Sequence, residues 1–163
     1  MTAASRNIRA TSGWPGGART LLFERLHQPV QAGPHVENTL APGELITGFS
    51  VPAGPWTRRS LYLKIRDRES YEFAIASAAV ALDIDGGQVR QARIGLGGMA
   101  YQPWRSHEAE AALIGKPLTE ESARAAAAAA LAGAVTHGGN DYKPELARRT
   151  LVRALLQAAQ MEA

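Results

Sequence analysis

The chain has 163 residues, of which 45% are hydrophobic, so it is long enough for one compact domain with a core and too short for two ordinary ones. It contains no cysteine, which excludes disulfides, thiolate metal sites and cysteine nucleophiles. Its formal charge of +3 comes from 18 Lys and Arg residues scattered among 15 Asp and Glu residues. Because the two signs are evenly mixed along the sequence, the charge does not indicate a nucleic-acid partner.

No apolar run in the sequence approaches the roughly 20 residues of a membrane-spanning helix. The first residues also lack the apolar stretch of a secretory signal peptide. We therefore expect a soluble, cytoplasmic protein with no membrane partner. A periplasmic location reached through a partner subunit stays open.

The first 39 residues form the least regular part of the sequence. They begin with the polar, aperiodic run MTAASRNIRATSGWPGGAR, whose burial would not offset the entropy lost on ordering. Residues 20–26 suit a short strand or one helical turn, and the Pro and Gly residues within 28–38 predict a loop. We therefore expect residues 1–39 to be an arm or linker, poorly ordered or held in part by a partner, ahead of an ordered domain at 40–163.

Strands dominate the first half of that domain. The alanine-rich run that ends before Asp85 has residues that favour helix, but its apolar side chains keep a period of two, and Asp85-Gly86-Gly87 then forms a hairpin turn. We interpret this run as a strand. The two-residue period predicts four strands in all, the first two joined as a hairpin with a longer loop: 44–51, 61–65, 73–84 and 89–96.

After Gly98 the pattern becomes helical. Ser106 and Thr119 are good N-caps, and each is followed by glutamates that the helix dipole favours. Gly115-Lys116-Pro117 ends the first helix, and Pro144 begins the third. Four antiparallel strands followed by three helices predict an α+β fold in which the helices pack on one face of the sheet. The third helix has one apolar stripe, formed by Ala147, Leu151, Ala154, Leu155 and Ala158, with Arg148, Arg149 and Arg153 on or near its polar side.

Residues that could carry catalysis are few. The four histidines, at positions 27, 35, 107 and 137, have no metal-ligand spacing, and no Ser/His/Asp arrangement stands out. Gly95-x-Gly97-Gly98 is not followed directly by a helix, so we interpret it as a turn at a strand end, not as a dinucleotide-binding loop. The sequence therefore offers no catalytic residue and no metal ligand.

Several separated runs carry a family resemblance. They are TLAPGELITGFSVP, SLYLKIRDRESYEFAIASAAVAL, ARIGLGGMAYQPWRSHEAEAALIGKPLTEE and KPELARRTLVRAL. In this order, over residues 19–158, they resemble the C-terminal domain of the FAD-binding (medium) subunit of molybdenum hydroxylases, the family of xanthine dehydrogenase, aldehyde oxidoreductase and CO dehydrogenase. The family's domain is also a sheet followed by three helices.

The resemblance implies a part of a molybdenum- and FAD-dependent oxidoreductase that is not catalytic alone. It places Lys64 near the isoalloxazine ring and Ile46 against the flavin as cofactor-binding residues, whereas Glu72 departs from an aspartate of some members. Most of the family's flavin site lies in an N-terminal domain that this sequence does not match, so we expect no tight FAD binding by this chain alone. The implied partners are that FAD-binding domain and the iron-sulfur and molybdopterin subunits, with a homodimer as a further option.

Two other functions stay open. One is a stand-alone α+β scaffold or protein-interaction domain that has kept the fold without the flavin. The other is a nucleic-acid module, which would use the one basic cluster in the sequence, although we expect no nucleic-acid partner. That cluster consists of Arg58, Arg59, Lys64, Arg66 and Arg68.

Overall fold

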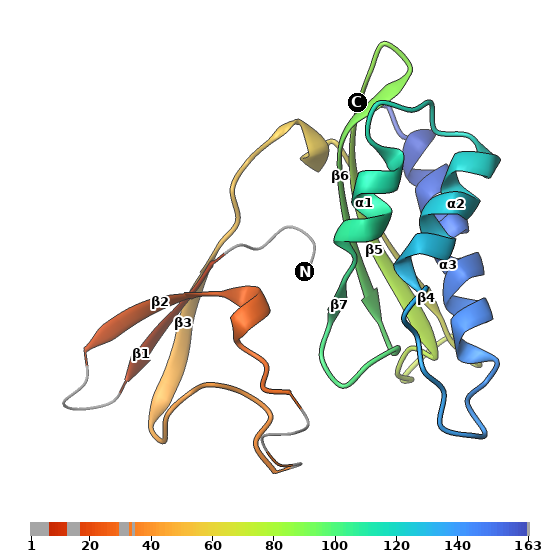
Figure 1. Cartoon of the computed structure of the whole chain (residues 1–163). Helices are drawn as coiled ribbons and strands as arrows, with labels where there is room; N and C mark the ends of the chain where they lie inside the picture. Colours follow the sequence, from red (N-terminus) through yellow and green to blue (C-terminus); the bar gives the residue numbers. More distant parts are fainter. Residues whose placement is uncertain (1–6, 13–16, 30–32, 34, 163) are drawn as a thin grey trace. The chain divides into compact units, whose positions relative to one another are not determined.

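The computed structural model describes residues 7–12, 17–29, 33 and 35–162 (Figure 1). It divides into two compact units, which meet in the chain between Ala53 and Gly54. This division falls later than the boundary after Thr39 that the sequence analysis predicted. The two units are described separately below.

The first unit is a small antiparallel sheet with the strand order β2-β1-β3. Two of its strands lie within the segment 1–39 that the sequence analysis treated as an arm. The predicted hairpin between residues 44–51 and 61–65 is wrong, because β3 pairs with β1 and not with the strand that follows it. The strands are β1 (Asn7–Ser12), β2 (Ala18–Leu22) and β3 (Glu44–Ser50), and a 3₁₀ helix, Phe23–Arg25, follows β2.

An ion pair and an aromatic contact hold the first unit together. Arg19 on β2 donates to both carboxylate oxygens of Glu44 on β3, each at 2.7 Å, and to the carbonyl of Thr39 at 2.8 Å. These bonds, with another from the Ala41 amide, lower the pKa of Glu44 from 4.5 to about 2. The rings of Phe23 and Phe49 lie 6.3 Å apart. Since Phe49 remains half exposed, this unit has little closed core.

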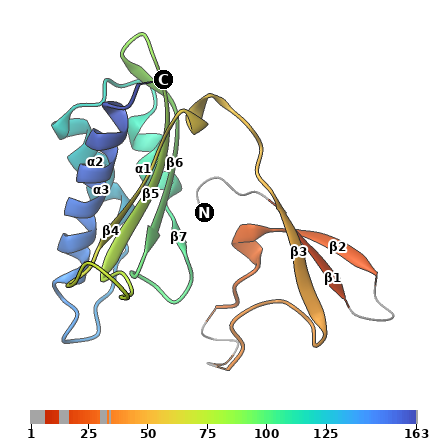
Figure 2. The same ribbon diagram turned by 180° about the vertical axis from the view of Figure 1, so that it is seen from behind.

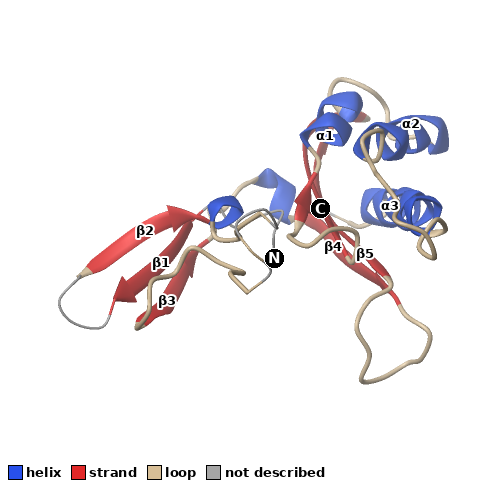
Figure 3. Ribbon diagram, turned by 60° about the horizontal axis from the view of Figure 1, so that its bottom comes forward, coloured by secondary structure: helices blue, strands red, loops and turns tan. Residues whose placement is uncertain are grey.

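The second unit contains the main sheet, of order β4-β5-β6-β7, and three helices that lie on one of its faces (Figures 1 and 2). Figure 3 shows the helices from the end of this layer. The α+β fold predicted from the sequence is therefore confirmed. The strands are β4 (Arg59–Ile65), β5 (Ala76–Asp85), β6 (Gln88–Gly97) and β7 (Trp104–Arg105), and the helices are α1 (His107–Leu113), α2 (Glu120–Ala130) and α3 (Lys143–Ala159).

The alanine-rich run is a strand, as predicted. β5 and β6 form a hairpin in which Asp85 pairs with Gln88, so the turn consists of Gly86 and Gly87. Their φ angles of 57° and 77° are those of a type I′ turn, which two glycines adopt without steric cost. The turn sets the pairing next to it, and a β-bulge between Asp83 and Ile84 then shifts the register by one residue. Leu82 therefore pairs with Ala92 and Val80 with Ile94, and these apolar residues meet the helices together.

The helix starts also follow the sequence. The Ser106 hydroxyl accepts the amide of Ala109 at 3.2 Å, and Thr119 and Ser122 bond reciprocally as a capping box. β7 was not predicted, because a two-residue strand has no periodicity to detect.

The core lies between the sheet and the helices and belongs entirely to the second unit. Small side chains fill much of it, since the buried face of α2 is made of alanines alone up to its last turn. Such a face lets a helix lie close to its neighbours. The apolar stripe predicted for α3 is fully buried, and the largest buried side chains include Leu82, Ile94, Leu96, Leu113, Leu131, Leu151 and Leu155.

Candidate functional site

One face of the main sheet is covered by the three helices, and the other carries Lys64. Side chains alternate between the two faces of a strand. On β4, Leu61 and Leu63 pack against the core, so Tyr62 and Lys64 lie on the opposite face. We call this opposite face the helix-free face. It holds the one predicted site residue of the second unit.

The strand register surrounds Lys64 with small residues. Lys64 lies opposite Ser77 on β5, which lies opposite Gly97 on β6. In the next row of this face, Tyr62 lies opposite Ala79, and Ala79 lies opposite Gly95. We call the four small residues of these rows the small-residue floor: Ser77, Ala79, Gly95 and Gly97.

Gly97 cannot become larger without changing this floor. A Cβ atom at Gly97 would lie 2.5 Å from the Ser77 Oγ atom, a distance that side chains do not adopt. The Ser77 hydroxyl therefore occupies the space beside Gly97, and Ser77 is itself buried, whereas the nearby Tyr62 is 59% exposed. An aromatic ring and an ammonium group beside short side chains suit a planar ligand that carries negative charge.

Lys64 is half-buried and held in place by the β4–β5 loop, residues 66–75. Its Nζ atom donates to the carbonyl oxygen of Glu72. The Glu72 carboxylate accepts the amide of Arg68 at 2.9 Å, and the Arg68 guanidinium donates to the carbonyl of Tyr71 at 2.6 Å. Glu72 therefore contacts Lys64 through its carbonyl oxygen and the start of the loop through its carboxylate, and so holds the loop against Lys64.

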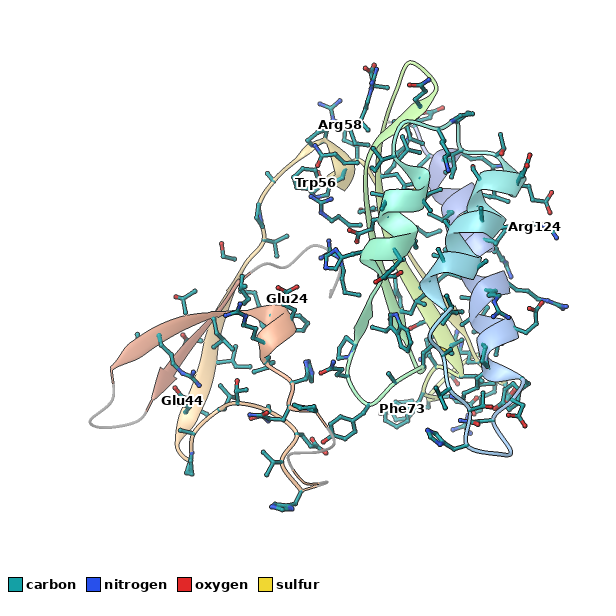
Figure 4. The ribbon with its side chains drawn as sticks, in the orientation of Figure 1. Glu24, Glu44, Trp56, Arg58, Phe73 and Arg124 are labelled. Atoms are coloured by element: carbon teal, nitrogen blue, oxygen red, sulfur yellow. The ribbon has the colours of Figure 1, made fainter. Side chains whose placement is uncertain are left out.

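The same loop presents two aromatic side chains to solvent. Tyr71 is 99% exposed and Phe73 is 95% exposed; Phe73 is labelled in Figure 4. Tyr71 has a φ of 50°, a left-handed conformation that is uncommon for a tyrosine and that the Arg68 bond to its carbonyl helps to hold. Large aromatic side chains so far from any cover are typical of a surface that contacts another molecule.

A second lysine joins the loops at this end of the sheet. The Lys143 Nζ atom, at the start of α3, donates to the carbonyls of Gly98 at 2.8 Å and Ile75 at 3.2 Å. Gly98 has a φ of 73°, and a Cβ atom there would lie 2.8 Å from the Ile75 oxygen. The Gly95-x-Gly97-Gly98 run therefore ends β6 in a turn, as the sequence analysis interpreted it.

Trp56 lies toward the other end of the helix-free face (Figure 4). It belongs to the 3₁₀ helix Pro55–Thr57, and the Arg93 guanidinium on β6 lies 5.1 Å from the centre of its ring. Arg93 is opposite Ala81, in the row next to that of Tyr62. This cation–π pair borders the small-residue floor.

Ile46, the second predicted site residue, lies in the first unit. It is on β3 opposite Ala10 and is 37% exposed. Ile46 and Lys64 therefore belong to two separate units, and the implied binding of one flavin by both residues stays a prediction.

The basic cluster does not form a stripe. Arg59 is on the helix side of β4, where its Nε atom donates to the Met161 carbonyl at 3.1 Å, whereas Lys64 is on the helix-free face. Arg68 is bonded within its own loop. This arrangement lacks the row of free cations that phosphate backbones require.

No group of three His, Asp or Glu residues suited to a metal ion occurs among the described residues. Over the same part of the chain, no helix is both long and apolar enough to cross a membrane.

The second unit is thus an α+β domain with Lys64 on its helix-free face and two exposed aromatic side chains on the β4–β5 loop. Comparison with known proteins identifies the family of this domain. Residues 61–158 match the family model for the CO dehydrogenase flavoprotein C-terminal domain. The chain belongs to this family.

Relatives in the family are FAD-binding or medium subunits. The chain is 36% identical over 143 residues to the aldehyde oxidoreductase FAD-binding subunit PaoB of Escherichia coli, covering 88% of this chain and 42% of PaoB. It is 32% identical over 148 residues to the carbon monoxide dehydrogenase medium chain of Afipia carboxidovorans, covering 88% of this chain and 49% of that protein. The chain therefore spans less than half the length of each of these relatives.

Solved structures give the same result. The reconstituted CO dehydrogenase from Oligotropha carboxidovorans matches with a TM-score of 0.86 and 28% identity, over 99% of this chain and 55% of that chain. Quinoline 2-oxidoreductase from Pseudomonas putida 86 matches with a TM-score of 0.80 and 25% identity, over 98% of this chain and 53% of that chain.

Some features of the site were not predicted. Tyr62 follows from the two-residue period of its strand, which places it on the face opposite to that of Leu61 and Leu63. The pairing of Ser77 with Gly97 and of Ala79 with Gly95 does not follow from the turn, because the β-bulge in this hairpin shifts the register by one residue. The contacts of Lys143 with Gly98 and Ile75 have no such signal, because they join residues 45 and 68 positions apart.

Proposed function

We propose that this chain serves as the C-terminal part of the FAD-binding subunit of a molybdenum hydroxylase. In this role it covers the flavin and docks the partner subunits, and it does not catalyse a reaction alone. The observation that carries the proposal is Lys64, held by Glu72 on the helix-free face beside the small-residue floor. The names of the relatives support the cofactor, since PaoB is an FAD-binding subunit.

The residues of the helix-free face fit one side of a flavin. The side chains of the floor are short, which would let an aromatic ring system approach the sheet, and the Lys64 ammonium group would lie at the edge of that ring system. FAD, when bound, would carry electrons between the substrate reaction and an acceptor. Lys64 would stabilise the negative charge that a flavin gains on reduction, and Ile46 would pack against the ring.

A chimera tests the proposal. The N-terminal part of PaoB would be joined to this chain in place of the matching C-terminal part. We expect the chimera to retain FAD, and we expect Lys64→Met to lower the flavin reduction potential because a positive charge near the reduced flavin is lost. Lys116→Met is the control, since Lys116 is exposed on the turn after α1. Loss of FAD from the chimera, or equal potentials in both variants, would contradict the proposal.

Ile46 has a matched control on the same strand. Ile46→Ser should weaken FAD retention in the chimera, whereas Leu45→Ser should not, because neighbouring residues of a strand point to opposite faces. Mixing the unfused chain with FAD should give no stoichiometric complex. Tight binding with quenched flavin fluorescence would contradict the expectation that most of the site lies elsewhere.

We further propose that the β4–β5 loop contacts the iron-sulfur subunit, with the molybdopterin subunit completing the complex in the cytoplasm. Tyr71 and Phe73 support this proposal by their nearly complete exposure. Replacing both by serine should abolish co-purification with the iron-sulfur subunit and leave FAD in the chimera. If the aromatics instead mediate a homodimer, sizing chromatography of the chain alone will detect a dimer that the same variant dissociates.

The stand-alone interaction domain is the second candidate. It is favoured by the same exposed aromatics, because they need no flavin to bind a partner. If the chimera with Lys64→Met contains no FAD and still binds every partner that the unmodified chimera binds, this candidate is favoured.

A further inference from the structure

A groove of about 650 Å³ lies between α2 and α3. It belongs to the helical layer, so the sheet separates it from the helix-free face. Its floor is apolar, formed by the buried Ala127 and the half-buried Val152 and Leu156. Four arginines and one glutamate also line it, which gives the groove a strong positive balance. The proposed flavin role uses none of these residues.

The arginines differ in how far they are neutralised. Arg149 donates to Glu145 at 2.8 Å, and Arg148 lies 3.6 Å from the same carboxylate. The hydrogen bond from Arg149 is the main cause that lowers the pKa of Glu145, and the charges of both arginines lower it further. Glu145 therefore remains ionised, and the two arginines share its charge. Arg153 is exposed and makes no ion pair with any described residue. Arg124 pairs with Glu120 on its own helix, in an ion pair whose two side chains are both exposed. The four arginines thus face two glutamates, which leaves a positive balance, and Arg153 is the arginine of the groove with no ion pair to a described residue.

The length of the groove indicates the kind of ligand. On α3 its lining runs from Glu145 to Gln160, which corresponds to about 22 Å at a rise of 1.5 Å per residue. A small anion would occupy a fraction of this length. A flat bilayer would meet the exposed arginines but would not reach apolar side chains that lie half-buried between two helices.

We propose that this groove binds an acidic amphipathic helix of a partner protein. The apolar face of that helix would lie on Ala127, Val152 and Leu156, and its Asp or Glu residues would pair with Arg124 and Arg153 on either side. Arg124, labelled in Figure 4, belongs to α2, whereas Arg153 belongs to α3. The two cations therefore come from the two helices that form the groove.

Peptide binding to the full chain tests the proposal. The probe is a fluorescein-labelled synthetic peptide of about four helical turns, with leucines along one face and glutamates on both sides of them. We expect saturable binding by fluorescence anisotropy that weakens as sodium chloride is raised. The double variant R124Q/R153Q should bind about tenfold more weakly. The matched control R58Q/R90Q removes the same charge at two exposed arginines outside the groove and should bind as the unmodified chain does.

Two further peptides and a map of the contact surface complete the test. A peptide with glutamine in place of glutamate, and one with serine in place of leucine, should each bind much more weakly. Amide NMR shifts caused by the original peptide should concentrate on α2 and α3. Absence of binding, equal binding by the glutamine peptide, equal losses in the two double variants, or shifts outside these helices would overturn the proposal. Binding of phosphatidylglycerol vesicles through Arg124 and Arg153 in place of the peptide would also overturn it.

The four substituted arginines are exposed, so the variants should keep the circular dichroism and urea midpoint of the unmodified chain. The flavin content of the chimera described above should not change with R124Q/R153Q. A negative result for peptide binding by the groove can therefore be told apart from a negative result for the flavin role.

Discussion

Glu110 is a buried charged residue whose carboxylate is held by several hydrogen bonds. It is 8% exposed, and its carboxylate accepts the Ile94 amide at 2.9 Å and the Arg105 guanidinium, whose Nη2 atom lies at 3.1 Å. It therefore accepts a backbone amide at the edge of β6 just where the two-residue β7 ends. From the sequence, Glu110 is only an acidic residue in the first turns of a helix, because nothing in the sequence pairs it with Arg105.

Glu110→Ala should destabilise the second unit by about 3 kcal/mol, since it leaves a half-buried guanidinium and a buried amide without an acceptor. Urea unfolding followed by tryptophan fluorescence measures this loss. The control is Glu69→Ala, at an exposed loop position, which should change stability by less than about 0.5 kcal/mol. Equal effects of the two substitutions would mean that the Glu110 contacts contribute nothing.

Gly98 gives a second test at a single residue. Gly98→Ala should cost about 1–3 kcal/mol, because alanine would have to adopt a φ of 73° with its Cβ atom against the Ile75 carbonyl. Gly133→Ala is the matched change, at a glycine with open space and no positive φ, and should be nearly neutral. Urea midpoints of both variants decide the matter, and a neutral Gly98→Ala would show that the β6 turn relaxes freely.

Among the elements, those with local signals were predictable. β5 was identified by its two-residue period in spite of its alanines, and the caps at Ser106 and Thr119 were identified by residue type. The partner of β3 was not, because a strand carries no local signal for which distant strand it joins, and β1 lies within a polar run. For the site, Lys64 came from the family resemblance alone, and its placement on the helix-free face came from the strand register.

The sheet of the first unit should be sensitive to acid. Because the pKa of Glu44 is lowered to about 2, its bonds with Arg19 and Ala41 stabilise this unit fully above the ordinary value of 4.5. That stabilisation is lost as the pH falls from 4.5 toward 2. Glu44→Gln should therefore be less stable than the unmodified chain at neutral pH and should change less on acidification. Thermal melting of the β3 amide signals by NMR, at neutral pH and at about pH 3, measures both effects.

If the two chains instead lose stability in parallel between these pH values, the ion pair does not hold the sheet. Glu37→Gln serves as the control, since Glu37 is an exposed acid of the same unit. It should leave the acid response of β3 unchanged.

At the scale of the whole molecule, the main core cluster of the described residues lies within residues 54–163. In the first unit, by contrast, Leu45 and Phe49 of β3 and the following Val51 are between 47% and 71% exposed. The two compact units meet after Ala53 and not after Thr39, because β1 and β2 of the polar N-terminal segment form a sheet with β3 in spite of their different compositions.

Residues 54–163 expressed alone should therefore keep the urea midpoint of the full chain, within about 1 kcal/mol in free energy of unfolding, whereas residues 1–53 alone should be largely unfolded. The fluorescence of Trp104 and the circular dichroism of each fragment measure this asymmetry. A stable 1–53 fragment, or a large loss of stability in 54–163, would contradict it.

The alanine face of α2 has a consequence for how the protein can be altered. A methyl side chain has no rotamers to lose, so this helix is ordered at little side-chain entropy, and its buried positions act as a spacer of fixed thickness between α1 and α3. A larger side chain at any of these buried positions would push α2 away from α1 or α3. Ala125 and Ala128 point outward on the same helix. They are consequently the positions at which a dye or a tether can be attached to a rigid part of this molecule without disturbing its interior.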